Sequence, residues 1–102
     1  MNMSNDIDRV VLDDRRITGK DKNVREYILL KSCGFDQNGA DRGVYSLFAR
    51  RDCLAEGNTP TGQVFLYDIA PTYEEAQRIF EMLSEGEAEP EHCRDIVEDL
   101  WC

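Results

Sequence analysis

Apolar residues recur at helical spacing over the last third of this chain of 102 residues. Between residues 73 and 83 they stand at offsets of 0, 3, 6, 7 and 10, and between residues 93 and 101 at offsets of 0, 3, 4, 7 and 8. Each set forms one stripe along an α-helix. The pattern therefore predicts two amphipathic helices with the stripes Tyr73, Ala76, Ile79, Phe80, Leu83 and Cys93, Ile96, Val97, Leu100, Trp101.

The residues that flank these stripes are typical helix ends. Thr72 and Glu75 have the spacing of a capping box, in which the Thr72 hydroxyl accepts the Glu75 N–H and the Glu75 carboxylate accepts the Thr72 N–H. Gly86 stands where a left-handed residue would end the first helix. Pro90 suits the first turn of the second helix, where its missing N–H has no partner to lose.

The chain before the helices shows the shorter repeats of β-strands. Four apolar segments, at residues 10–18, 25–33, 44–51 and 63–70, are separated by polar loops. The first has a charged middle that is typical of an edge strand, and the second has apolar groups on both faces, as a central strand has. Asn38-Gly39 in the loop between the second and third segments indicates a hairpin turn.

Two helices of this length are not stable alone in water, so their apolar stripes must pack on the preceding strands. The sequence predicts an α+β fold, a four-stranded antiparallel meander with two C-terminal helices packed on one face. We expect residues 9–102 to form a single domain and residues 1–8 to form a disordered N-terminal tail.

The predicted strands carry more apolar residues than two helices can cover. The other face of the sheet would then expose an apolar patch with residues such as Tyr45, Leu47, Phe65 and Tyr67, or their alternates. A patch of that kind marks an interaction surface, which here would join two copies of the chain or hold a partner. In the alternative, the strands coil strongly, or the first strand and the long loops fold over this face.

Charge is distributed very unevenly along the chain. Residues 1–67 hold ten acidic and ten basic residues, whereas residues 68–102 hold eleven acidic residues and two arginines, so the net charge of −9 belongs to the helical third. The net negative charge disfavours binding to nucleic acid, whose phosphates are also negative. It favours either a solvated helix face or a docking face for a basic protein partner, and mimicry of nucleic acid is a third reading.

Two arginine pairs provide a further charge pattern. Arg15-Arg16 and Arg50-Arg51 lie on predicted strands, where such residues often protect an edge. If the pairs cluster, their natural counterpart is the acidic helical third, either within the chain or across a dimer.

Few residues in the chain are of types that commonly catalyse reactions or bind metals. The four cysteines have no metal-site spacing, and we expect Cys93 in the core and Cys102 as an exposed terminal thiol. The chain has a single histidine, so we predict no catalytic residue, no metal and no cofactor. A candidate polar site remains at His92, Asp95 and Asp99, and Asp95 could hydrogen-bond the imidazole from the same helix face.

The last segment of the chain resembles the end of a family of short uncharacterised proteins of Clostridia-type Firmicutes. The matching residues are Pro90, His92, Asp95, Val97, Glu98 and Asp99. The resemblance is best over residues 63–102 and implies a bacterial cytoplasmic protein, but no activity. The polar N-terminus lacks the apolar region of a signal peptide, and no apolar run is long enough to cross a membrane, so we expect the cytoplasm.

These observations favour a non-catalytic cytoplasmic domain that binds protein and associates with itself through its sheet face. The alternative is a small-ligand-binding or enzymatic domain that uses a cleft between helices and sheet near His92 and Asp95.

Overall fold

The computed structural model describes residues 9–35, 41–54, 57 and 59–101. The chain forms a four-stranded sheet in the order β1-β2-β3-β4, with every neighbouring pair antiparallel, followed by two helices. The elements are β1 (Val10–Thr18), β2 (Asn23–Phe35), β3 (Asp41–Cys53), β4 (Thr59–Ala70), α2 (Tyr73–Glu85) and α3 (Pro90–Leu100). The predicted α+β meander with two C-terminal helices is confirmed.

Strand bounds differ from the prediction mainly in length. The bounds of β1 are as predicted, and β1 is an edge strand, whereas β2, β3 and β4 extend into segments that the sequence marks as loops. These polar ends stay in the sheet because each antiparallel partner supplies backbone hydrogen bonds. Pro60 fits inside β4 because β4 is the other edge, where a missing N–H breaks no ladder. Asn38-Gly39 lies outside the described residues.

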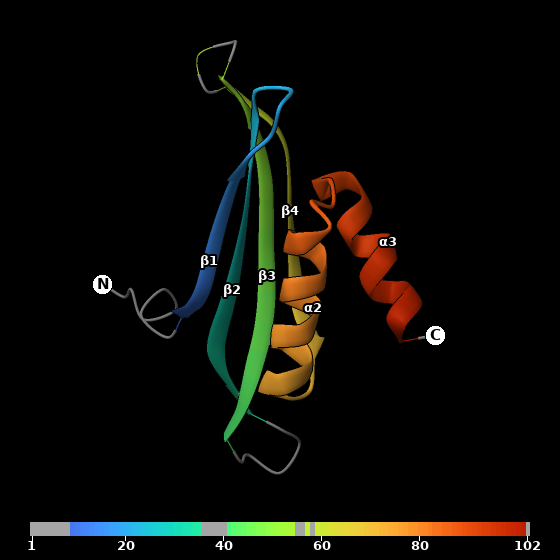
Figure 1. Ribbon diagram of the computed structural model, residues 1–102. Helices are drawn as coiled ribbons and strands as arrows, with labels where there is room; N and C mark the ends of the chain where they lie inside the picture. Colours follow the sequence, from blue (N-terminus) through green and yellow to red (C-terminus); the bar gives the residue numbers. More distant parts are fainter. Residues whose placement is uncertain (1–8, 36–40, 55–56, 58, 102) are drawn as a thin grey trace, which may run out of the picture.

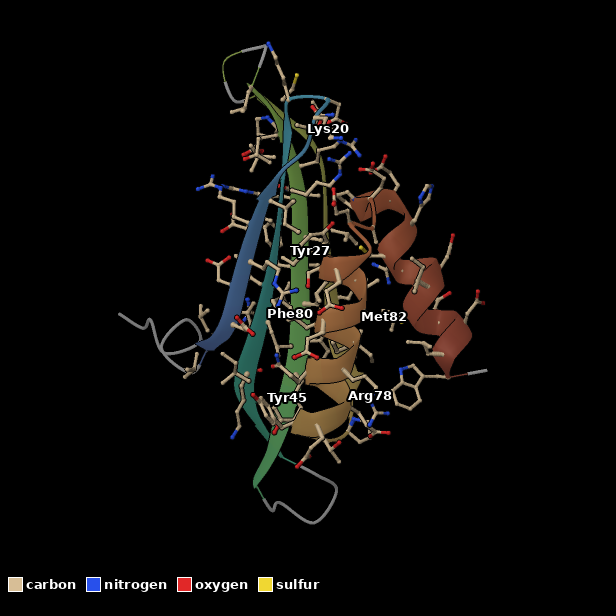
Figure 2. All side chains as sticks on the ribbon, viewed as in Figure 1. Lys20, Tyr27, Tyr45, Arg78, Phe80 and Met82 are labelled. Carbon is tan, nitrogen blue, oxygen red and sulfur yellow. The ribbon has the colours of Figure 1, made fainter. Side chains whose placement is uncertain are left out.

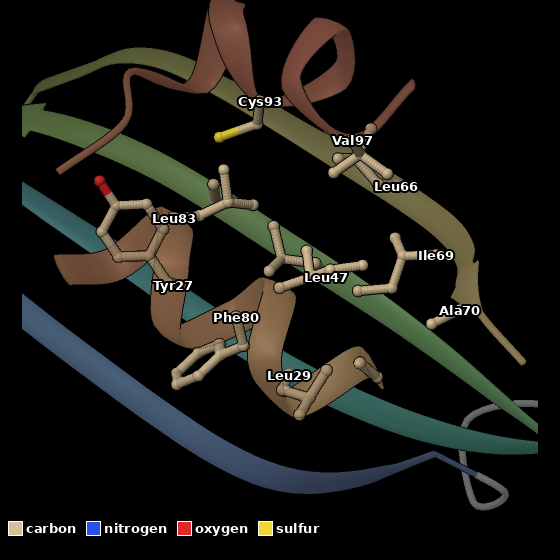
Figure 3. Close-up of a cluster of buried hydrophobic side chains, with 13 residues drawn as sticks. Tyr27, Leu29, Leu47, Leu66, Ile69, Ala70, Phe80, Leu83, Cys93 and Val97 are labelled. Carbon is tan, nitrogen blue, oxygen red and sulfur yellow. The ribbon is translucent and has the colours of Figure 1, made fainter. Parts of the chain in front are cut away.

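Both helices lie on the same side of the sheet (Figure 1). Helix α2 packs across β2, β3 and β4, and α3 lies along β4 and β3. The side chains between these two layers form the core shown in Figure 3. Among the described residues, no helix is long and apolar enough to span a membrane.

The register of the strands decides which residues the helices cover. Leu47 pairs with Leu29 on one side and with Leu66 on the other, and all three are buried in the core. Tyr45 lies on the same face (Figure 2). The centre of its ring is 6.2 Å from that of Tyr73 on α2. The prediction that Tyr45 and Leu47 belong to the uncovered face is therefore wrong.

The opposite face carries the other set of alternating residues. Phe48 pairs with Ile28 and with Phe65, so these three side chains form a row on the side of the sheet away from the helices. Tyr67, two residues after Phe65, points to the same side by alternation and is 62% exposed. Phe65 and Tyr67 thus belong to the uncovered face, with Phe48 in place of Leu47.

A β-bulge changes the sides to which β1 residues point. The register shifts between Val11 and Asp13, so that Leu12 and Ile17 both pack against the core while Val11 is 58% exposed. Strict alternation would place Val11 and Ile17 on the same face of β1, but alternation does not hold across the extra residue.

The start of α2 shows half of the expected capping box. The Thr72 hydroxyl accepts the Glu75 N–H at 3.3 Å, as predicted. The Glu75 carboxylate, however, accepts a hydrogen bond from the Thr72 hydroxyl at 3.1 Å. The pair still fixes the first turn of the helix.

The end of α2 differs by one residue from the prediction. Gly86 has a helical φ of −81°, and Glu87 takes the left-handed conformation with φ of 51°. The N–H groups of Glu87 and Ala88 donate to the carbonyls of Ser84 and Leu83, which is the Schellman pattern. Gly86 fits because a Cβ there would lie 3.1 Å from the Met82 carbonyl oxygen.

Candidate functional site

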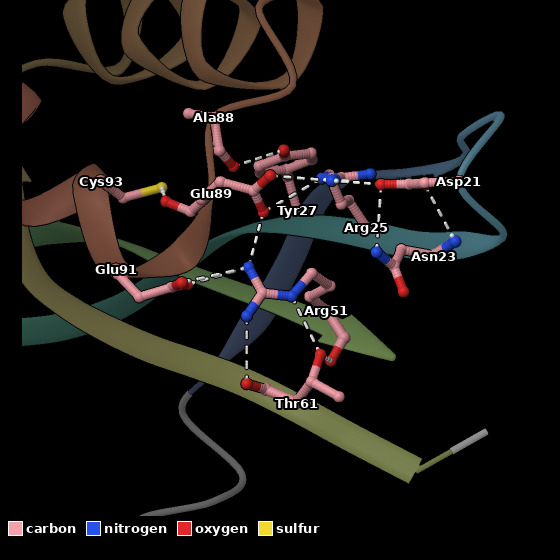
Figure 4. Close-up of polar contacts among 10 residues, drawn as sticks. All are labelled: Asp21, Asn23, Arg25, Tyr27, Arg51, Thr61, Ala88, Glu89, Glu91 and Cys93. Carbon is pink, nitrogen blue, oxygen red and sulfur yellow. Dashed lines mark hydrogen bonds and ion pairs between the residues drawn. The ribbon is translucent and has the colours of Figure 1, made fainter. Parts of the chain in front are cut away.

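A cluster of arginines and carboxylates fastens the α2–α3 connection to the sheet (Figure 4). Glu89 receives hydrogen bonds from Arg25 Nε at 3.2 Å, from Arg25 Nη2 at 2.7 Å and from Arg51 Nη1 at 2.6 Å. Arg25 also contacts Asp21 at 3.2 Å, and Arg51 contacts Glu91 at 3.0 Å. Glu89 is the N-cap residue of α3, but its carboxylate binds the two arginines and accepts no capping hydrogen bond from the helix.

The pKa values in this cluster follow from the pairing. Hydrogen bonds from Arg25 and then from Arg51 lower the pKa of Glu89, although partial burial opposes them. The hydrogen bond from Arg25 lowers the pKa of Asp21 to about 2. The same contacts raise the pKa values of Arg25 and Arg51, with Glu89 as the largest cause for both. Because the charges satisfy one another, the cluster stabilises the fold and presents no free group to a substrate.

The arginine pairs on the strands divide between the two faces. Arg15 donates to Ser84 Oγ at 2.9 Å, lies 3.9 Å from the Glu85 carboxylate and stands over the Phe80 ring. Arg15 and Arg51, one arginine of each pair, therefore contact the acidic helical third inside the chain. Arg16 and Arg50 alternate to the opposite face of the sheet.

Two buried groups near the cluster also have shifted pKa values. The Tyr27 hydroxyl donates to the Ala88 carbonyl at 2.7 Å, and burial raises its pKa. Burial, with smaller contributions from Glu91 and Glu89, raises the pKa of Cys93 to about 11. Cys93 is fully buried, as predicted, and a thiol of this kind is a poor nucleophile. Cys102 lies outside the described residues.

The candidate polar site at His92, Asp95 and Asp99 does not assemble. All three side chains are exposed on α3, and within the described part of the chain no hydrogen bond or ion pair joins them. The helix buries Cys93 and Val97 against the sheet, so the stripe of His92 faces outward. No group of three potential metal ligands is present among the described residues.

A groove lies instead between the end of β4 and a neighbouring stripe of α3. Its volume is about 590 Å³. Its lining is mainly apolar with a few charged groups, namely Leu66, Tyr67, Asp68, Ile69, Ala70, Pro71, Arg94, Val97, Glu98 and Trp101. This groove is not the cleft that the sequence predicted, because His92 and Asp95 do not line it.

The groove depends on an irregularity in β4. Asp68 has a positive φ of 58°, and its N–H donates to Ser46 Oγ at 3.3 Å, where the register with β3 shifts. The shift buries both Ile69 and Ala70, and the Ile69 carbonyl accepts a hydrogen bond from Trp101 Nε1 at 2.9 Å. In the sequence, only the apolar spacing of Val97 and Trp101 pointed to this contact, because the alternation of apolar residues in β4 does not reveal the bulge.

The uncovered face of the sheet is the second candidate. Four of the described apolar residues on this face are half-buried, namely Ile28, Leu30, Phe48 and Phe65. Val11 is exposed. Two others on this face, Val24 and Val44, are buried. We call the set Val11, Ile28, Leu30, Phe48 and Phe65 the open face, and we leave Tyr67 out of it because Tyr67 lies on the edge strand β4 and also lines the groove. The guanidinium of Arg9 lies 5.1 Å from the centre of the Phe65 ring.

A charged row borders the open face. Arg50 contacts Glu26 at 3.3 Å and Asp52 at 3.7 Å. Burial, and then the hydrogen bond with Asp14, raise the pKa of Glu26. Asp52 is 7% exposed, and its Oδ1 atom has no hydrogen-bond partner among the described residues. These groups are partly removed from water although no helix covers this side of the sheet.

In comparisons with known proteins, no family model matches the chain, and no match was found among the curated proteins or the solved structures.

Proposed function

We propose that the chain is a non-catalytic protein-interaction module that associates with a second copy of itself through the open face. The observation that supports this proposal most strongly is the row of Ile28, Phe48 and Phe65 on the side of the sheet opposite both helices. Apolar rings and branched side chains in one contiguous patch are the usual core of a protein interface.

The two edges of the sheet are poorly suited to association, which leaves the face. On β1 the bulge after Val11 and the charged middle of the strand discourage pairing with another strand. On β4 the edge contains Pro60 and the turn at Asp68, and Trp101 already occupies the Ile69 carbonyl. A second strand added at either edge would meet these obstacles, whereas a second sheet face would not.

Charge and area both favour a second copy as the partner. Residues 1–67 have no net charge, so two open faces can meet without strong repulsion, and the acidic helices would then point away from each other. Four strands spaced about 4.8 Å apart and about ten residues long give a flat area of roughly 600 Å². The corrugated surface is larger, and a stable interface buries about 800 Å² on each partner.

Sedimentation equilibrium over a wide range of concentrations tests the proposal. We expect the native chain to form dimers, and Phe65→Glu and Val11→Glu to weaken the dimer at least about tenfold by placing a charge in the interface. Met82→Glu is the matched control, because Met82 is 40% exposed on α2, on the other layer. A native chain that stays monomeric, or a Met82→Glu effect equal to that of Phe65→Glu, would refute the proposal.

In such a dimer the outer surfaces of α2 and α3 would carry the remaining acidic residues. Glu85, Glu89 and Glu91 are paired within the chain, whereas Asp95 and Asp99 are exposed on α3. We propose that this acidic surface receives a basic protein partner. Its contacts would be sensitive to salt, and the apolar dimer interface would be much less so.

A further inference from the structure

The groove between β4 and α3 carries an inference that is separate from self-association. We propose that it binds a small organic cation, a positively charged amine or ammonium group attached to an apolar body. Three features of the lining favour such a ligand: an apolar floor, two aromatic side chains that remain exposed, and the sign of the surrounding charge.

The floor of the groove suits an apolar group of limited size. Leu66, Ile69, Ala70 and Val97 are buried residues that line it. A volume of about 590 Å³ falls within the range of about 300 to 1,000 Å³ that is usual for small-molecule sites. A ring or a short branched chain that covered this floor would remove its own apolar surface from water.

The two aromatic side chains are available to a ligand. Trp101 lines the groove and is 50% exposed. Tyr67 alternates toward the uncovered face, but it lies on the edge strand β4, where it also lines the groove and is 62% exposed. The hydrogen bond from Trp101 Nε1 to the Ile69 carbonyl fixes the position of the indole ring. The faces of tyrosine and tryptophan rings attract cations, and ammonium groups are commonly held between them.

The charge of the region selects a cation over an anion. Glu98 lines the groove, and residues 68–102 around it carry a net charge of −9. Among the described residues that line the groove, Arg94 is the only basic one. It lies four residues before Glu98 on α3, where the two side chains can approach each other. A carboxylate ligand could use Arg94, but it would enter against the field of the whole helical third.

Trp101 provides a direct assay because it is the only tryptophan in the chain. Its fluorescence is followed during titration of the full chain with phenethylammonium, with 3-phenylpropionate and with phenethyl alcohol. The three probes share one ring and differ in charge. We expect saturable binding of the ammonium compound, at least about tenfold tighter than that of the carboxylate and clearly tighter than that of the alcohol.

Variants separate the groove from general charge effects. Glu98→Gln should weaken phenethylammonium about fivefold, and Tyr67→Leu should weaken it by a similar factor, because each removes one attraction for the cation. Asp95→Asn is the matched control, since it removes the same charge from the outward stripe of α3. Val11→Glu should leave binding intact, which separates this site from the open face.

Three results would overturn the inference. The first is tighter binding of 3-phenylpropionate, which would assign the groove to anions through Arg94. The second is no saturable response to any probe. The third is equal weakening by Asp95→Asn and Glu98→Gln, which would show that cations respond only to the overall charge.

Discussion

Glu89 gives the sharpest test of how the helices are held on the sheet. Its carboxylate accepts three hydrogen bonds, two from Arg25 and one from Arg51. The arginine side chains are only 9% and 15% exposed. Replacing Glu89 with glutamine keeps its size but removes the negative charge from between two poorly solvated cations, so the free energy of unfolding should fall.

The size of this loss follows from the contacts. A hydrogen bond between charged groups contributes about 1.5 to 3 kcal/mol. The Glu89 side chain is 32% exposed, so solvent weakens these contacts. We therefore expect Glu89→Gln to cost about 2 kcal/mol, which lowers Tm by roughly 10 °C in a domain of this size.

The dependence on pH distinguishes a charge effect from a packing effect. Because pairing lowers the pKa of Glu89 below its ordinary value of 4.5, the stabilisation is fully present above that value. It is lost as pH falls through the lowered pKa. The difference between the native chain and Glu89→Gln should therefore be constant near neutral pH and should shrink under acid conditions.

Urea unfolding of both chains at several pH values measures this difference. Glu91→Gln is the matched control, because Glu91 contacts the same Arg51 but its side chain is 55% exposed, and we expect a much smaller loss. Equal losses for the two variants, or a Glu89→Gln loss that persists unchanged in acid, would refute this account of the cluster.

Two further predictions follow from the structure. Glu87→Gly should raise the free energy of unfolding by about 1 kcal/mol, because the positive φ of Glu87 costs an L-residue about that much. Thermal melts measure this difference, and a destabilised variant would contradict the Schellman ending of α2. Cys93 should resist alkylation in the folded chain at pH 8 and react in urea, because it is buried and its pKa is raised to about 11. Mass spectrometry measures the labelling, and rapid alkylation of Cys93 in the folded chain would contradict its burial.

Much of the fold could be predicted because local signals agreed with the packing. Thr72 and Pro90 mark helix starts through their own backbone chemistry, which needs no knowledge of the tertiary structure. The charged middle of β1 identified an edge in the same way. The left-handed residue at Glu87 was missed because its position depends on where the helix stops against the sheet.

The uncovered face was only partly predictable because it depends on strand register. Alternation correctly separates Leu47 from Phe48, but only the pairing of β3 with β4 shows that Phe65 shares a face with Phe48. The bulge after Val11 shifts the register of β1 with β2, and the bulge at Asp68 shifts that of β3 with β4. Alternation of apolar residues alone does not locate either bulge.

The groove was missed for a related reason. Helical spacing placed Trp101 on the apolar stripe of α3, where it is half exposed and bonds the Ile69 carbonyl. The sequence drew attention to His92 because it is the only imidazole, although residue type alone does not tell which side of a helix faces a cavity. The structure shows that the side of α3 with Arg94 and Glu98 faces the groove beside β4.

The central claim is that the side of the sheet without helices meets a second copy of the chain. Isotope-filtered nuclear Overhauser spectra of a mixture of labelled and unlabelled chains test it most directly. We predict contacts between the two copies from the methyl groups of Ile28 and Leu30 to the rings of Phe48 and Phe65. Contacts confined to α2 and α3, or none between copies at millimolar concentration, would contradict the claim.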